Sequence, residues 1–159
     1  MAVYFLDTSA IVKRYFQEQG YDWIQALHNP VQGRELYVSQ IALVEVVASI
    51  CRKAHEQNIP VERRDTTISN FRRSVEKTYS VWLVNEAVFI AAGDLCRSYR
   101  LRSYDAVQLA CAIAVREDAL AVQPLEVKPS DFVFVSGDLK LLDVALAERF
   151  RVENPSNYS

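Results

Sequence analysis

Two stretches of the chain share one order of apolar and polar residues. Residues 3–6 form a short run of β-branched, aromatic and aliphatic residues, which is typical of a strand. The run ends at Asp7, two hydroxyl residues follow, and the next apolar residues recur at helical spacing. Residues 132–135 repeat this order, with a hydroxyl residue, Asp138 and then a leucine-rich segment after them. Each stretch predicts a strand that ends near an acid and leads into a helix.

The residues between these stretches alternate between strand and helix patterns. Further strands are expected at 36–38 and 80–84, and helices at 9–16, 21–27, 41–50, 63–77, 86–99, 106–115 and 139–146. Strands that alternate with helices in this way predict an α/β fold with a mainly parallel sheet. In such a sheet ligands bind beyond the carboxyl ends of the strands, which is where Asp7 would lie.

Composition limits the kind of protein. The 159 residues are 50% hydrophobic with four glycines, which suits a single domain over residues 1–159. No apolar run approaches the roughly 20 residues that cross a bilayer, and a secretory signal is not expected from the first residues. We therefore expect a cytoplasmic protein. A formal net charge of −2 excludes general attraction to nucleic acid, so such binding would need a local basic patch.

The cysteines and histidines do not form a recognisable site. The three cysteines are far apart in apolar helical patterns, which favours small buried side chains over disulfides. His28 and His55 have no cysteine or histidine partner at the spacing of zinc ligands. We therefore expect no zinc site.

Glu45 interrupts the apolar run at 41–50. The run is apolar on nearly every face, so its helix is expected to be buried. An ionised carboxylate in such surroundings is unfavourable unless it is paired or bound to a cation. One explanation is that Glu45 leans to a solvent-exposed edge of the helix, or forms an ion pair with Arg52 or Lys53, about two helical turns away. The other is a functional site.

Asp105 stands at the start of another apolar helix. Helix capping or the helix dipole would explain Asp7, Asp105 and Asp138 one by one, but neither explains Glu45. A single shared site explains all four. Carboxylates brought together repel one another, and an oxygen-rich donor set selects Mg²⁺ or Mn²⁺ over zinc. Metals held in this way activate water for phosphodiester cleavage.

The segments around these acids resemble the acidic motifs of PIN-domain ribonucleases, and the likeness is closest to VapC-type toxins of toxin–antitoxin modules. The segments are Leu6-Asp7-Thr8-Ser9-Ala10, Glu45 within its apolar helix, Tyr104-Asp105-Ala106-Val107-Gln108-Leu109-Ala110 and Val135-Ser136-Gly137-Asp138-Leu139-Lys140-Leu141-Leu142. Their order is kept over nearly the whole chain. One departure is the proline-containing stretch at 123–131, which is longer than expected between these elements.

This resemblance implies a three-layer α/β/α sandwich on a mainly parallel central sheet. It also implies a Mg²⁺- or Mn²⁺-dependent endoribonuclease. In that family the acids bind the metal and serve in catalysis, and the residues that correspond here are Asp7, Glu45, Asp105 and Asp138. The family further implies a homodimer and a cognate antitoxin protein that restrains the enzyme.

Two alternatives stay open. A PIN-like domain could bind RNA or a partner protein without catalysis, or it could process RNA outside a toxin–antitoxin module. Retention of all four acids favours catalysis. An NTPase or a dinucleotide-binding protein is not supported, because the chain has no GxxxxGK[ST] or GxGxxG motif. A haloacid-dehalogenase phosphatase would have a second aspartate where this chain has Ser9.

Contacts to RNA are expected from basic and aromatic residues near the acids. Lys13, Arg14 and Tyr15 follow Asp7 closely in the sequence, and the stretch at 63–77 is rich in arginine. Contacts of this kind bind phosphate and weaken as the salt concentration rises.

Overall fold

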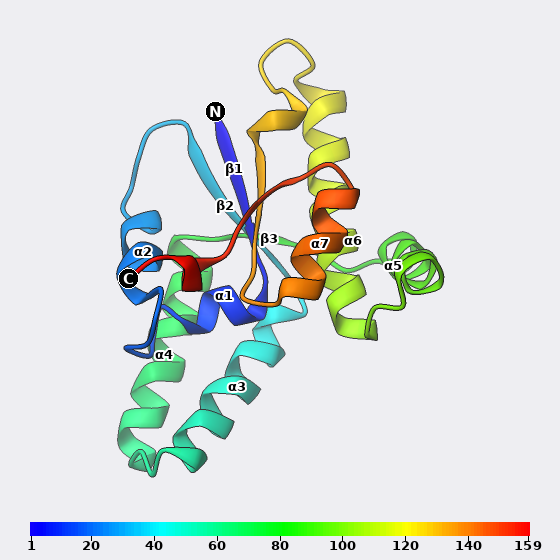
Figure 1. Cartoon of the computed structure of the whole chain (residues 1–159). Helices are drawn as coiled ribbons and strands as arrows, with labels where there is room; N and C mark the ends of the chain where they lie inside the picture. The colour runs from blue at the N-terminus through cyan, green and yellow to red at the C-terminus, as the bar shows by residue number, and fades with distance from the viewer.

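The computed structural model describes all residues from Met1 to Ser159. It contains a five-stranded sheet in the order β3-β2-β1-β4-β5 (Figure 1), and every pair of neighbouring strands is parallel. The strands are β1 (Ala2–Leu6), β2 (Arg34–Ser39), β3 (Ser80–Trp82), β4 (Phe132–Val135) and β5 (Arg151–Glu153). The predicted α/β class and the parallel sheet are confirmed.

Seven α-helices and two short 3₁₀ helices connect and follow the strands. They are α1 (Thr8–Val12), α2 (Tyr21–Leu27), α3 (Ala42–Glu56), α4 (Val61–Lys77), α5 (Glu86–Tyr99), α6 (Ser103–Val122), η1 (Pro129–Asp131), α7 (Leu139–Ala147) and η2 (Pro155–Asn157). Figure 1 shows α3 and α4 extending side by side away from the sheet, with α5, α6 and α7 on its other side. None of the helices is both long enough and apolar enough to cross a membrane.

The sheet separates two apolar cores. Side chains alternate between the faces of a strand, and in β4 Phe132 and Phe134 pack with residues of α5, α6 and α7. Val133 and Val135 pack on the opposite face with residues of α1, α2, α3 and α4. The molecule is therefore an α/β/α sandwich, as expected. All three cysteines are free thiols.

The strand order places a crevice between β1 and β4. From β1 the chain passes to β2 and then β3 on one side, and it returns to β4 on the other side of β1. Helices that follow β1 and β4 therefore leave the sheet toward opposite faces, and this reversal opens a gap at the carboxyl ends of the two strands. Asp7 and Asp138 follow these two strands.

Candidate active site

An open cleft of about 710 Å³ lies at the carboxyl ends of β1 and β4. Eighteen residues line it, of which two are hydrophobic, so it is a polar cleft. The structure brings to this cleft all four acids that the sequence singles out, namely Asp7, Glu45, Asp105 and Asp138. Neither a histidine nor a cysteine lines it.

Asp7 is the most deeply buried of the four acids, with 4% of its surface exposed. Its Oδ1 accepts hydrogen bonds from the Ser9 hydroxyl at 2.7 Å and from the Ala10 amide at 3.0 Å, so it also caps α1. Its Oδ2 accepts one from the Ser136 hydroxyl at 2.5 Å. Burial raises the pKa of Asp7 to about 6, because desolvation outweighs these hydrogen bonds.

The two serines also tie β1 to β4. The Gly137 amide donates to Ser9 Oγ at 2.8 Å, and the Asp138 amide donates to Ser136 Oγ at 3.0 Å. Both hydroxyls therefore connect Asp7 to the segment that carries Asp138. The motif segments contain these serines, but the sequence alone does not reveal their role.

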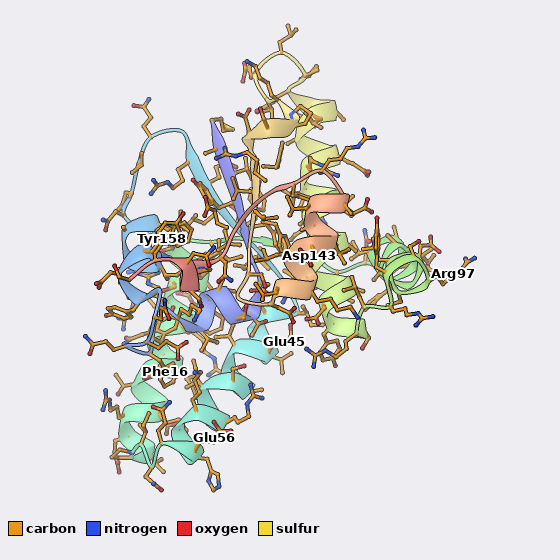
Figure 2. All side chains as sticks on the ribbon, viewed as in Figure 1. Phe16, Glu45, Glu56, Arg97, Asp143 and Tyr158 are labelled. Carbon is orange, nitrogen blue, oxygen red and sulfur yellow. The ribbon has the colours of Figure 1, made fainter.

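Glu45 lies in the first turn of α3, where it is half-buried. Figure 2 shows it at the end of α3 nearest the sheet, opposite Glu56 at the far end. Its Oε1 accepts hydrogen bonds from Thr8 Oγ1 at 3.0 Å and from Gln108 Nε2 at 2.8 Å. The expectation that α3 is buried on nearly every face is wrong, because Val44 beside it is 62% exposed.

The predicted alternative for Glu45, an ion pair within its own helix, is also wrong. Lys53 is paired with Glu18 at 2.9 Å, and Arg52 donates to the Ser49 hydroxyl at 3.3 Å. The spacing of residues 45, 49, 52 and 53 places them on one face of α3, and all four line the cleft. This face therefore presents an acid near the sheet and two bases farther along.

Asp105 and Asp138 share a counter-ion. Arg102 Nε lies 3.4 Å from Asp105 Oδ2, and its Nη2 lies 3.7 Å from Asp138 Oδ2. Burial raises the pKa of Asp105, the Arg102 charge opposes this shift, and the Asp138 charge adds to it. Asp138 also caps α7 by accepting from the Leu141 amide at 3.1 Å. Asp7 and Asp138 therefore each cap a helix and also line the cleft.

The donor chemistry of this cleft fits a hard divalent cation, because carboxylate and hydroxyl oxygens dominate its floor. In this arrangement no three of the acids are grouped closely enough to hold a metal ion. Arg102 neutralises Asp105 and Asp138 in this arrangement. Its side chain is 84% exposed.

The basic residues expected to bind RNA lie in different places. Lys13 lines the cleft, whereas the Arg14 guanidinium lies 3.4 Å from the Ser74 hydroxyl, outside it. Arg63 and Arg64 line a separate cavity of about 340 Å³ near α3 and α4. The cleft instead contains three bases that the sequence did not assign to it, which are Arg52, Lys53 and Arg102. Arg52 and Lys53 reach the cleft because α3 packs against the segment that follows α1.

Comparisons with known proteins identify the fold and the family. Twelve chains of solved structures match. A chain of VapBC2 from Rickettsia felis, solved bound to a DNA fragment from their promoter, is 13% identical with a TM-score of 0.60, covering 96% of this chain and 98% of that one. PAE2754 from Pyrobaculum aerophilum is 13% identical with a TM-score of 0.48, covering 98% and 91%. No curated protein matches in sequence. The PIN domain model matches residues 4–122, and the chain therefore belongs to the PIN domain family, whose members are typically nucleases.

Proposed function

We propose that the protein is an endoribonuclease that uses Mg²⁺ or Mn²⁺ to cleave phosphodiester bonds in RNA. One observation carries the proposal: four acids from distant segments of a PIN-domain chain line a single cleft open to solvent. An unsupported cluster of carboxylates would be unfavourable, and a divalent cation offsets that repulsion. The proposed catalytic and metal-binding residues are Asp7, Glu45, Asp105 and Asp138.

The residues of the cleft would have separate roles in the reaction. A bound Mg²⁺ or Mn²⁺ would activate water and stabilise the charge that develops on the departing oxygen. Ser9 and Ser136 would keep the Asp7 carboxylate in one orientation, because both hydroxyls donate to it. Arg102 would release Asp105 and Asp138 when the metal binds. With no histidine in the cleft, a carboxylate or solvent would accept the proton of the attacking water.

Cleavage of RNA by the purified protein tests this proposal. A labelled mixed-sequence RNA should be cut in Mn²⁺ or Mg²⁺ and left intact in EDTA. Asp7→Asn should abolish cleavage, whereas Asp143→Asn, an exposed position on α7 that Figure 2 labels, should cut like the wild type. Equal cleavage in metal and EDTA, or full activity of Asp7→Asn, would refute it. Metal-independent RNA binding without cleavage would favour the non-catalytic alternative.

We further propose that the enzyme is the VapC-type toxin of a type II toxin–antitoxin pair and acts as a single-domain, cytoplasmic protein. The fold it shares with a chain of the VapBC2 complex supports an antitoxin partner. All five strands join one sheet, which supports a single domain over residues 1–159. A homodimer is the proposed assembly.

Expression tests the toxin role separately from the chemistry. Wild-type protein should arrest growth, Asp7→Asn should not, and co-expression of the adjacent small reading frame should restore growth with the wild type. RNA cleavage in vitro without any arrest would favour an RNA-processing nuclease outside such a module. Light scattering should give twice the mass of the 18.1 kDa chain, and a monomer at high concentration would contradict the dimer.

A further inference from the structure

One carboxylate in the cleft is shared by two lysines. Glu18 Oε1 lies 3.3 Å from Lys13 Nζ, and Glu18 Oε2 lies 2.9 Å from Lys53 Nζ. Lys13 follows α1, Glu18 belongs to the segment before α2, and Lys53 belongs to α3. All three line the same cleft as the four acids.

Lys13 runs directly beside the acidic part of the cleft. Its side chain is 12% exposed. Its Cε lies 3.6 Å from the point where a Cβ on Gly137 would stand. The Gly137 amide bonds Ser9, which in turn donates to Asp7. Lys13 therefore lies next to the acids, and Glu18 links it to Lys53.

The lysine pair, Lys13 and Lys53, carries more positive charge than Glu18 neutralises. Two ammonium groups share one carboxylate, which leaves one positive charge without a counter-ion in the pair. Burial by itself raises the pKa of Glu18, but hydrogen bonds and charge from Lys53 and Lys13 outweigh it and lower the pKa, so Glu18 is ionised at neutral pH. Arg52, in the same cleft, has a hydroxyl as its partner and no acid.

The ammonium groups also have unused hydrogen-bond donors. An ammonium has three N–H donors. Lys13 uses two, to Glu18 and to the Gln19 carbonyl at 3.2 Å, and Lys53 uses one, to Glu18. A structural link between the α1–α2 segment and α3 needs only the Glu18–Lys53 bond. The second lysine and the spare donors instead suit an anion that bridges both ammonium groups.

We propose that Lys13 and Lys53 form a binding site for a backbone phosphate of the RNA strand whose scissile bond lies at the acids. This proposal rests on the proposed function. Lysine binds phosphate as a point charge, and Lys53 lies about 12 Å along α3 from Glu45. The site would thus hold a neighbouring phosphate of the same strand. An acidic peptide fits less well, because the four carboxylates of the cleft would repel it.

RNA binding in EDTA tests the site without cleavage. The probe is a fluorescein-labelled, single-stranded 20-nucleotide RNA, and anisotropy gives Kd over a series of salt concentrations. Lys13→Met and Lys53→Met should each weaken binding about fivefold to tenfold, and should reduce the slope of log Kd against log salt by about 0.7, the value for one phosphate contact on a single strand. The control is Lys128→Met, an exposed position before the amino end of β4 and away from the cleft, which should bind like the wild type.

Glu18→Gln separates this site from a purely structural link. It removes the shared carboxylate and keeps both lysines, so RNA should bind as tightly as to the wild type or more tightly, even if the variant melts at a lower temperature. A loss of binding in Glu18→Gln that follows its loss of stability would overturn the proposal. So would lysine variants that bind like Lys128→Met, or equal competition by polyglutamate and polyphosphate.

The two proposals fail in distinguishable ways. Wild-type protein that binds RNA through Lys13 and Lys53 but never cleaves it in Mn²⁺ would refute the proposed activity and support the phosphate site. Wild-type protein that cleaves RNA while both lysine variants bind and cleave equally well would refute the phosphate site alone.

Discussion

Gln108 Nε2 donates to Glu45 Oε1 at 2.8 Å and lies 3.0 Å from Thr8 Oγ1. This amide joins α6, α3 and the start of α1 at one point. Gln108 is 2% exposed, and its Oε1 is buried with no hydrogen-bond partner. Because Gln108 lies one turn after Asp105, α6 supplies one acid of the cleft and fixes the position of another.

Substitution of Gln108 should therefore loosen Glu45. We expect Gln108→Met to lower the free energy of unfolding by about 1–2 kcal/mol, because Glu45 loses a buried donor. Gln108→Glu should lower it further in EDTA, because it sets a second carboxylate against Glu45, and Mn²⁺ should restore part of that loss. Urea denaturation in EDTA and in Mn²⁺ measures both effects, with exposed Gln123→Met as the control. A Gln108→Met variant as stable as the wild type would contradict this role.

Asp7 should destabilise the metal-free protein at neutral pH. Burial holds its pKa near 6, so ionisation at pH 7 is unfavourable in the folded state. Asp7→Asn keeps the shape and removes that charge, and we expect the free energy of unfolding in EDTA to rise by about 1–3 kcal/mol. Denaturation at pH 7 checks this, with exposed Asp143→Asn expected to change little. A less stable Asp7→Asn would mean that its hydrogen bonds outweigh the desolvation.

His28 should make the protein less stable as the pH falls. Its Nδ1 lies 2.7 Å from the Ile24 carbonyl, its Nε2 lies 2.6 Å from the Tyr79 hydroxyl, and burial lowers its pKa from 6.5 to about 4. Between these values the unfolded chain binds a proton that the folded chain does not. The contribution of His28 to the free energy of unfolding is therefore fully present above pH 6.5. It should fall by up to about 3 kcal/mol as the pH is lowered toward 4.

The measurement must separate His28 from Asp7. Between pH 6 and 4 the Asp7 carboxyl acts in the opposite direction, because its folded form binds a proton more tightly than its unfolded form. Urea denaturation from pH 7.5 to 4.5 in an Asp7→Asn background removes the contribution of Asp7. Adding His28→Gln should reduce the slope of the free energy of unfolding against pH. Adding His55→Gln, at an exposed position, should leave that slope unchanged. Equal slopes in the two variants would exclude His28 as the cause.

Gly20 should be intolerant of a side chain. Its φ is +90°, and a Cβ there would lie 2.5 Å from the Pro155 carbonyl oxygen of η2. We expect Gly20→Ala to lower the free energy of unfolding by at least about 1 kcal/mol. Gly93→Ala is the matched control, because that site in α5 is open, and alanine should stabilise the helix by about 0.5–1 kcal/mol. Similar melting temperatures for the two variants would contradict the prediction.

Local sequence patterns predict much of the fold. β4 and α5 agree with their predicted bounds, because β-rich apolar residues mark the strand and Asn85 caps the helix by accepting from the Val88 amide. The predicted helix at 9–16 ends at Val12 instead, where the chain turns back. In α5 the apolar side chain of Phe89 is 57% exposed, whereas that of Val88 beside it is buried. In α5 apolar residues occur on more than one face, so spacing alone cannot identify the buried one.

The candidate site could be predicted only in part for a similar reason. Strand ends and an isolated acid in an apolar run reveal Asp7, Asp138 and Glu45, because each breaks a local pattern. The contacts of Ser136 with Asp7 and of Lys53 with Glu18 join residues far apart in the sequence, and no local pattern signals them. The sequence suggests Glu45 as the desolvated acid, whereas the structure gives that place to Asp7.

The position of β1 between β2 and β4 also governs when the site can exist. On the ribosome Asp7, Glu45 and Asp105 emerge first, whereas Ser136 and Asp138 emerge later. Until β4 pairs with it, β1 has an open edge and Asp7 lacks the hydroxyl of Ser136. The proposed active site is therefore incomplete in any nascent chain that has not yet reached residue 138.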